Sequence, residues 1–172
     1  DLWPEESPRK SESNLKLTLL RLRKSLEPSL SKEFNSSYIH LRDDFVLLDP
    51  ELCEVDAHLF LSQLKNGEEK ENRGDINGAL SSYAEAMKIY KGDFLPEEVY
   101  APWVDLKREE LKGKYIEFLN RMAELYEKRG ASTRAIACYK KAIEADPLSE
   151  QGCRNLMTLY SNKGRVNEAL RT

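Results

Sequence analysis

The side chains with the widest chemical range in this chain are two histidines and three cysteines. A closed structural zinc site needs four ligands, usually Cys and His, around one ion. His40, His58 and Cys53 would supply three of them, and the fourth would have to come from the distant Cys138 or Cys153. We therefore expect no metal site. We expect His58 to be a partly buried packing residue, and the two later cysteines to be small core residues.

Carboxylate pairs could in principle act as a general acid and base. Glu68–Glu69 and Glu109–Glu110 are each adjacent in the sequence. On a helix, neighbouring side chains point about 100° apart and cannot converge on one substrate. Neither G-x-x-x-x-G-K-[ST] nor G-x-G-x-x-G occurs, so no phosphate-binding loop is indicated. The sequence predicts no enzyme and no cofactor.

The strongest local charge is positive and lies near the start of the chain. Between residues 9 and 32 there are seven lysines or arginines against two glutamates. Residues 11–26 predict an amphipathic helix, because four leucines recur at i, i+4, i+7 and i+11. These are Leu15, Leu19, Leu22 and Leu26. The opposite arc holds basic residues and Leu17, with no acid predicted to pair with them, which favours a binding surface over a merely solvated face.

A β-hairpin is expected directly after this helix. The serine- and asparagine-rich connector at residues 35–37 leads into YIHLRDDFVLL, whose apolar positions alternate around Arg42, Asp43 and Asp44. The predicted hairpin covers about residues 37–48. A basic helix followed by a hairpin is the layout of a winged helix, in which the helix enters the major groove of DNA.

The second half of the chain is repetitive. Three positions recur with a period of 34 residues, and a related unit precedes them by 56 residues. The recurring residues are Tyr126, Gly130 and Ala135, then Tyr160, Gly164 and Ala169, with Gly74, Ala79, Tyr83 and Ala86 in the earlier unit. Small alanines let two antiparallel helices approach closely, and glycine ends the first helix of each pair. Tyr83 and Tyr139 should fill the space between neighbouring helices.

An insert separates the first two units, at about residues 91–114. It predicts a turn followed by a helix that begins near Ala101–Trp103 and continues into the next unit. We expect Trp103, Leu106 and Leu111 to share one face that covers the first unit. Core packing is favoured for Trp103 over an exposed anchor for a partner, because tryptophan is usually buried.

These motifs resemble two known families. RMAELYEKRGASTRAIACYKKAIEADP resembles a tetratricopeptide (TPR) motif. DLWPE, SNLKLTLLRLRKSLEP and YIHLRDDFVLL resemble the second half of an OmpR-type winged-helix domain. Joined to GDFLPEEVYAPWVDLKREEL, the whole resembles the bacterial transcriptional activator domain of antibiotic regulatory protein-like regulators. The Trp3-Pro4 junction is among its most diagnostic parts, and the missing first half of the winged helix leads us to expect a fragment of a longer regulator.

The resemblance implies a mainly α fold: a partial winged helix at residues 1–50, then TPR-like antiparallel helix pairs at 51–172. It implies contacts with promoter DNA in the full-length protein, and self-association, for example as a homodimer, or contact with RNA polymerase or another protein. The DNA-contacting residues it implies are Asn14, Lys16, Leu17, Thr18, Arg21, Lys24 and Arg42.

The partner-binding surface is predicted at the C-terminal end of the repeats. The last unit stops where its second helix should begin, so the helix at about residues 150–162 has little after it. Leu156, Leu159 and Tyr160 should therefore form an exposed stacking face.

Two alternatives stay open. One is a pure TPR-type interaction module of a larger signalling protein, in which the first helix docks by burying Leu17 and Leu20. The other is a helper domain of a signalling ATPase. No run of 18 apolar residues occurs, no signal peptide is visible and the cysteines are scattered, so we expect a cytoplasmic protein with no membrane contact.

Overall fold

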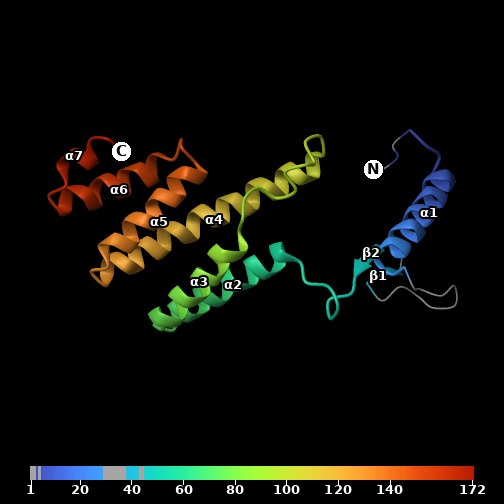
Figure 1. The fold of residues 1–172 in the computed structure, drawn as a ribbon, viewed down its shortest axis with the longest axis horizontal. Coiled ribbons are helices and arrows are strands. Elements are labelled where there is room, and N and C mark those ends of the chain that lie inside the picture. Colours follow the sequence, from blue (N-terminus) through green and yellow to red (C-terminus); the bar gives the residue numbers. More distant parts are fainter. Residues whose placement is uncertain (1–2, 4, 29–37, 43–44) are drawn as a thin grey trace. The chain divides into compact units, whose positions relative to one another are not determined.

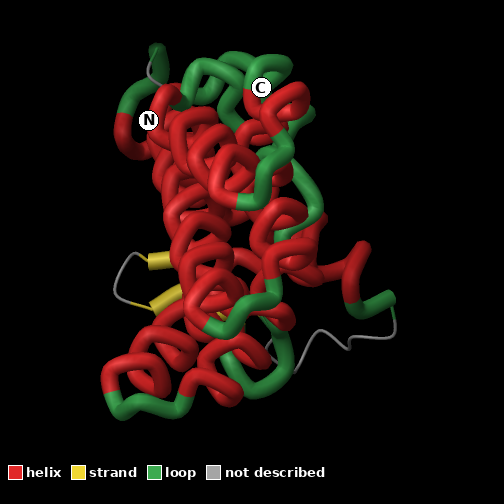
Figure 2. The backbone as a smooth tube through the Cα atoms, turned by 90° about the vertical axis from the view of Figure 1, so that its left-hand side faces the viewer, coloured by secondary structure: helices red, strands yellow, loops and turns green. Residues whose placement is uncertain are grey.

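The computed structural model describes residues 3, 5–28, 38–42 and 45–172. Pro4 of the junction, the connector at 35–37 and the hairpin tip Asp43–Asp44 lie outside the described residues. The chain divides into two compact units, residues 1–54 and 55–172. Figure 1 shows the helices of each unit in sequence colours, and Figure 2 distinguishes helices from the two strands.

The first unit is one helix and one hairpin. Helix α1 (Pro8–Leu26) begins three residues before the predicted start, because proline is well accommodated at the first helical position. Strands β1 (Ile39–Arg42) and β2 (Phe45–Leu48) pair antiparallel, with Ile39 opposite Leu48 and Arg42 opposite Phe45. The predicted helix followed by a hairpin is therefore present.

One side chain ties the helix to the hairpin. Arg23 of α1 donates two hydrogen bonds to the Ile39 carbonyl oxygen, at 3.2 Å from Nε and 3.0 Å from Nη2. Leu19 and Ile39 are both buried. Leu22 and Leu26, from the same apolar stripe as Leu19, stay about half exposed. The stripe is therefore only partly covered within this unit.

The second unit consists of helix pairs. Its helices are α2 (Asp56–Asn72), α3 (Ile76–Ile89), α4 (Pro102–Lys128), α5 (Ser132–Ala145), α6 (Glu150–Asn162) and α7 (Val166–Ala169). Neighbouring helices contact each other in the pairs α2–α3, α4–α5 and α6–α7. Each pair turns at a glycine in the left-handed region, Gly74, Gly130 or Gly164, as the spacing predicts.

The predicted repeat residues build the core. Ala79, Ala135, Tyr83 and Tyr139 are all buried, the alanines completely. Aromatic rings fill the space between α2, α3 and α4, where the Phe118 ring contacts the rings of Phe60, Tyr83 and Tyr115. The expectation that small alanines let the helices approach, with tyrosines between them, is confirmed.

The insert keeps its predicted helix but turns a different face inward. Helix α4 is continuous for 27 residues, as expected. Val104 and Leu111 are buried, whereas Trp103 is 61% exposed and Leu106 is 78% exposed. The expectation of core packing for Trp103 and Leu106 is therefore wrong. Val104, Leu111 and Tyr115 are spaced by seven and four residues, and this neighbouring stripe faces the core instead.

Two further single-residue expectations have different outcomes. Cys138 is buried in the core, as predicted, and Cys153 is half-buried. His58 is exposed on the first turn of α2, so its predicted packing role is wrong. The neighbouring positions Ala57 and Phe60 provide the buried face of that turn.

Candidate DNA and partner surfaces

Helix α1 presents one exposed face away from the hairpin. Leu17, Arg21 and Lys24 are spaced i, i+4 and i+7 and are all exposed, with Thr18 exposed beside them. Arg23 lies on the other side of the helix, where it bonds the hairpin. The hairpin therefore fixes which face of α1 is free.

This face carries positive charge that is not neutralised locally. Among the described residues, neither Arg21 nor Lys24 forms an ion pair with a carboxylate. Arg42 is exposed at the end of β1, next to the tip of the hairpin. Exposed cations without carboxylate partners suit an anionic surface such as the phosphates of DNA.

Two of the residues implied for DNA binding are engaged by nearby glutamates. Asn14 is half-buried, and its Nδ2 donates to Glu6 Oε2 at 3.0 Å. Lys16 forms an ion pair with Glu12, one helical turn earlier, and this hydrogen bond lowers the pKa of the Glu12 carboxyl. The expectation that no acid pairs with the bases of this helix is wrong for Lys16.

The exposed leucines bear on the docking alternative. That alternative requires Leu17 and Leu20 to be buried. Leu17 is 47% exposed and Leu20 is 49% exposed. Within the first unit neither side chain is buried, so both stay available to DNA or to a docking surface.

The predicted partner face at the C-terminal end is not exposed. Leu156, Leu159 and Tyr160 are each buried to the same degree, 3% exposed. Helix α6 contacts α5 on one side and α7 on the other, so even the short α7 closes this face. The Arg165 guanidinium lies over the Tyr160 ring, 4.8 Å from its centroid. These three residues belong to the core, and the expectation that they are exposed is wrong.

A groove between α2 and α4 offers a different polar surface. It encloses about 270 Å³, with Leu61, Leu64 and Phe118 at its base and charged residues of both signs along its walls. Arg121 of α4 bridges to Glu68 at 3.1 Å and Glu71 at 3.2 Å on α2. The sequence analysis missed this groove, because its residues lie about 50 positions apart.

Each of two repeats contains the same partly buried hydrogen bond. The Tyr83 hydroxyl donates to Glu71 Oε2 at 3.0 Å, and the Tyr139 hydroxyl donates to Glu127 Oε1 at 2.7 Å. Burial, together with these carboxylates, raises the pKa of both phenols well above the usual range. Both glutamates stand three residues before the turn glycine of their pair, a signal that could have identified them.

The insert contributes an exposed apolar patch made of Val99, Tyr100, Trp103 and Leu106. The loop before it is fastened by Arg108, whose Nε donates to the Phe94 carbonyl at 3.1 Å and whose Nη2 donates to the Leu95 carbonyl at 2.9 Å. Exposed apolar clusters of this kind occur at protein-binding sites.

No group of three or more His, Cys, Asp or Glu side chains gathers around a metal-sized space in the part of the chain that the structure describes. Burial raises the pKa of the Cys138 thiol to about 11, so it stays protonated and unreactive at neutral pH. Over the same described residues, no helix has the length and apolar character needed to cross a bilayer.

Comparison with known proteins places the second unit in a family. Residues 55–172 match the model of the bacterial transcriptional activator domain (BTAD). The chain is 30% identical over 104 residues to the photosystem I assembly protein Ycf3 of Synechococcus sp. strain CC9605, covering 60% of this chain and 49% of that protein. The Ycf3 of strain WH7803 is 27% identical over the same length and with the same coverage. The chain thus spans about half the length of these curated relatives.

A solved structure also resembles the chain. The crystal structure of MamA is 19% identical, with a TM-score of 0.33, and the match covers 65% of this chain and 72% of that one.

Proposed function

The chain belongs to the bacterial transcriptional activator domain family, and on that premise we propose that it is part of a transcription regulator. In this proposal the unit of α1 and the hairpin contacts promoter DNA. The helical unit, residues 55–172, contacts protein partners, either a second copy or RNA polymerase.

The observation that carries the DNA proposal is the free basic face of α1. Arg21 and Lys24 are exposed and lack carboxylate partners among the described residues, while Arg23 holds the hairpin on the opposite side. A helix that is oriented by its neighbours and carries exposed cations can enter the major groove without rearrangement.

Each residue of this face has a proposed role. Arg21 donates to the acceptor edge of guanine, and Leu17 contacts a thymine methyl group. Lys24 and Thr18 bind phosphates, and Arg42 reaches the backbone from the hairpin. Asn14 and Lys16 take part only if they leave Glu6 and Glu12, so their contribution is smaller.

Protein contacts by the helical unit are supported by the family and by the relatives, which are named as assembly proteins. The groove between α2 and α4 and the apolar patch of the insert are the surfaces available for them. We also propose that the chain has no catalytic role and works in the cytoplasm, where its three free cysteines stay reduced.

Fluorescence anisotropy with a labelled random-sequence duplex tests the DNA proposal on the 172-residue chain. We expect weak, salt-dependent binding by this chain alone, and Lys24→Ala should reduce the slope of log affinity against log salt by about 1. Arg73→Ala is the control, because Arg73 is exposed on the helical unit and pairs with Glu69. Equal salt slopes for Lys24→Ala, Arg73→Ala and wild type would contradict the proposal.

Sequence preference is tested separately by selection from a random duplex pool. Arg21→Ala should flatten the preferred motif at one position, since an arginine–guanine pair is worth about 1–3 kcal/mol of discrimination. The alternative, a TPR-type interaction module that does not bind DNA, predicts no enriched motif for wild type or variant. It gains support only if the duplex is not bound even at low salt.

A further inference from the structure

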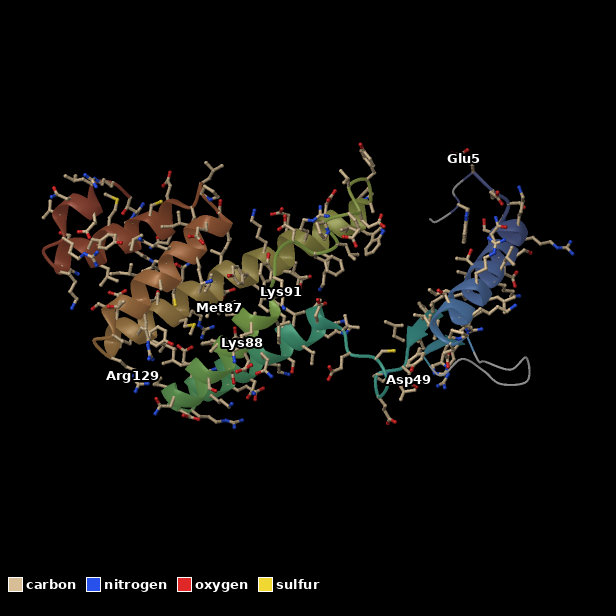
Figure 3. The ribbon with its side chains drawn as sticks, in the orientation of Figure 1. Glu5, Asp49, Met87, Lys88, Lys91 and Arg129 are labelled. Carbon is tan, nitrogen blue, oxygen red and sulfur yellow. The ribbon has the colours of Figure 1, made fainter. Side chains whose placement is uncertain are left out.

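A second cavity in the helical unit has a chemistry that the proposed function does not use. It is an open surface hollow of about 480 Å³, lined largely by exposed polar side chains, where the start of α3, the end of α4 and the start of α5 meet. Its polar walls come from Asn77 and Ser81 of α3, from Tyr126 and from two arginines, Arg129 and Arg134. Figure 3 labels Arg129 at the end of α4, beside the green helices of the first pair.

Both arginines are positioned by neutral groups. Arg129 Nη1 donates to Asn77 Oδ1 at 2.5 Å, across the cavity from α4 to α3. The Arg134 guanidinium lies over the Tyr126 ring, 5.6 Å from its centroid. Within the described part of the chain, neither arginine forms an ion pair with a carboxylate, in contrast to Arg121, which has two. The cavity therefore holds two positive charges without a counter-charge.

Further hydrogen-bond donors line the same cavity. The Ser81 hydroxyl can donate, and so can the Asn77 amide nitrogen, because the amide oxygen already accepts from Arg129. Helix α5 begins here with Ala131 at its N-cap, so no side chain accepts from its first N–H groups. The Ser132 and Arg134 N–H groups donate to the Gly130 and Ala131 carbonyls, and the positive end of the helix dipole still adds to the charge of the arginines.

We propose that this cavity binds a small molecule that carries a phosphate monoester. A phosphate monoester has nearly two negative charges and three acceptor oxygens, which match two guanidinium groups that each offer paired N–H donors. The volume exceeds what a bare phosphate needs and falls in the range of about 300–1,000 Å³ typical of small-molecule sites. The buried Leu80 provides an apolar surface for the organic part.

Such a ligand would act on the partner-binding unit and not on the DNA-contacting one. It would join α3 of the first helix pair to α4 and α5 of the second through a single bound group. Occupancy of the cavity would therefore stabilise one arrangement of the two pairs. Binding of such a ligand does not require DNA binding, so the two can be tested separately.

Isothermal titration calorimetry of the 172-residue chain, at fixed ionic strength, tests the proposal. The probes are inorganic phosphate, ribose 5-phosphate, adenosine monophosphate and O-phosphoserine. We expect saturable one-to-one binding of ribose 5-phosphate, of adenosine monophosphate or of both. Arg129→Gln and Arg134→Gln should each weaken it by about tenfold or more, because each removes charged hydrogen bonds. Arg73→Gln, which removes a charge outside the cavity, should bind like wild type.

A variant that leaves both arginines in place separates loss of binding from loss of folding. Ser81→Glu puts a carboxylate at an exposed helical position of the cavity, and it should abolish binding while circular dichroism stays unchanged. Three results would overturn the proposal: no heat from any probe at millimolar concentration, arginine variants that bind like wild type, or binding of O-phosphoserine alone. The last result would assign the cavity to a phosphorylated protein segment.

Discussion

The first helix pair packs so closely that one position in α2 has no room for a Cβ atom. A Cβ added to Gly67 in α2 would lie 2.4 Å from the Tyr83 ring, whereas one added to Gly113 in α4 would meet nothing within 4 Å. We expect Gly67→Ala to destabilise the fold by about 1–3 kcal/mol through overpacking. Gly113→Ala should stabilise it by about 0.5–1 kcal/mol, since alanine favours a helix interior. Urea unfolding of both variants measures the difference, and equal effects would contradict the close approach.

The buried phenols give the second prediction at residue scale. The pKa values of Tyr83 and Tyr139 are raised in the folded chain by burial and by hydrogen bonds to glutamate. The unfolded value is about 10, so their stabilising contribution is complete below pH 10 and is lost as the pH rises through 10 toward the folded-state values. Burial raises the pKa of Tyr90 to about 12, so Tyr90 adds to the same loss of stability at high pH.

We therefore expect the free energy of unfolding to fall steeply above pH 10, as followed by urea titration and far-ultraviolet circular dichroism. Tyr139→Phe should cost about 1–2 kcal/mol at pH 8, because it removes the hydrogen bond to Glu127. The free energy of unfolding of this variant should also fall less steeply with pH above pH 10 than that of wild type. A variant whose stability falls with pH as steeply as that of wild type would show that Tyr139 does not contribute.

At the scale of elements, α6 is a core helix and not an open end. Leu156 is buried between α5 and α7, while its neighbour Met157 is 41% exposed. Leu156→Ala should cost about 2–5 kcal/mol of stability. Met157→Ala should stay within about 0.5 kcal/mol. Chemical unfolding compares them, and a Leu156→Ala protein of wild-type stability would restore the exposed-face interpretation.

The loop of the insert depends on one side chain of α4. Arg108 donates to the carbonyls of Phe94 and Leu95. Arg108→Ala should leave those carbonyls unpaired and open the loop, so that chymotrypsin cleaves faster after Phe94 and Tyr100. Lys107→Ala is the matched control, because Lys107 pairs with Glu110 within α4. Mass spectrometry of timed digests should show the same cleavage rate for the control as for wild type.

At the scale of the whole molecule, the chain is two compact units joined near residue 54. The core of the second unit is drawn entirely from its own helices. Residues 55–172 alone should therefore keep their helical circular dichroism and unfold at the same urea concentration as in the full chain. A shift of the midpoint by more than experimental error would show that the first unit stabilises the second.

The sequence by itself determined the helix pairs, their turns and the helix followed by a hairpin. These features depend on local spacing: glycine where the backbone turns left-handed, alanine where helices touch, and leucine every three or four residues. The period of 34 residues also carried the resemblance to the family that residues 55–172 match.

Only the tertiary structure decided which apolar face each helix buries and which charges come together. Val104 is buried and Trp103 exposed, although both are apolar neighbours, and Leu156 is covered by a helix of only four residues. Arg129 and Arg134 line the same cavity as Asn77, which lies about 50 residues earlier in the sequence. Burial and pairing depend on where distant segments lie, and a local pattern contains no such information.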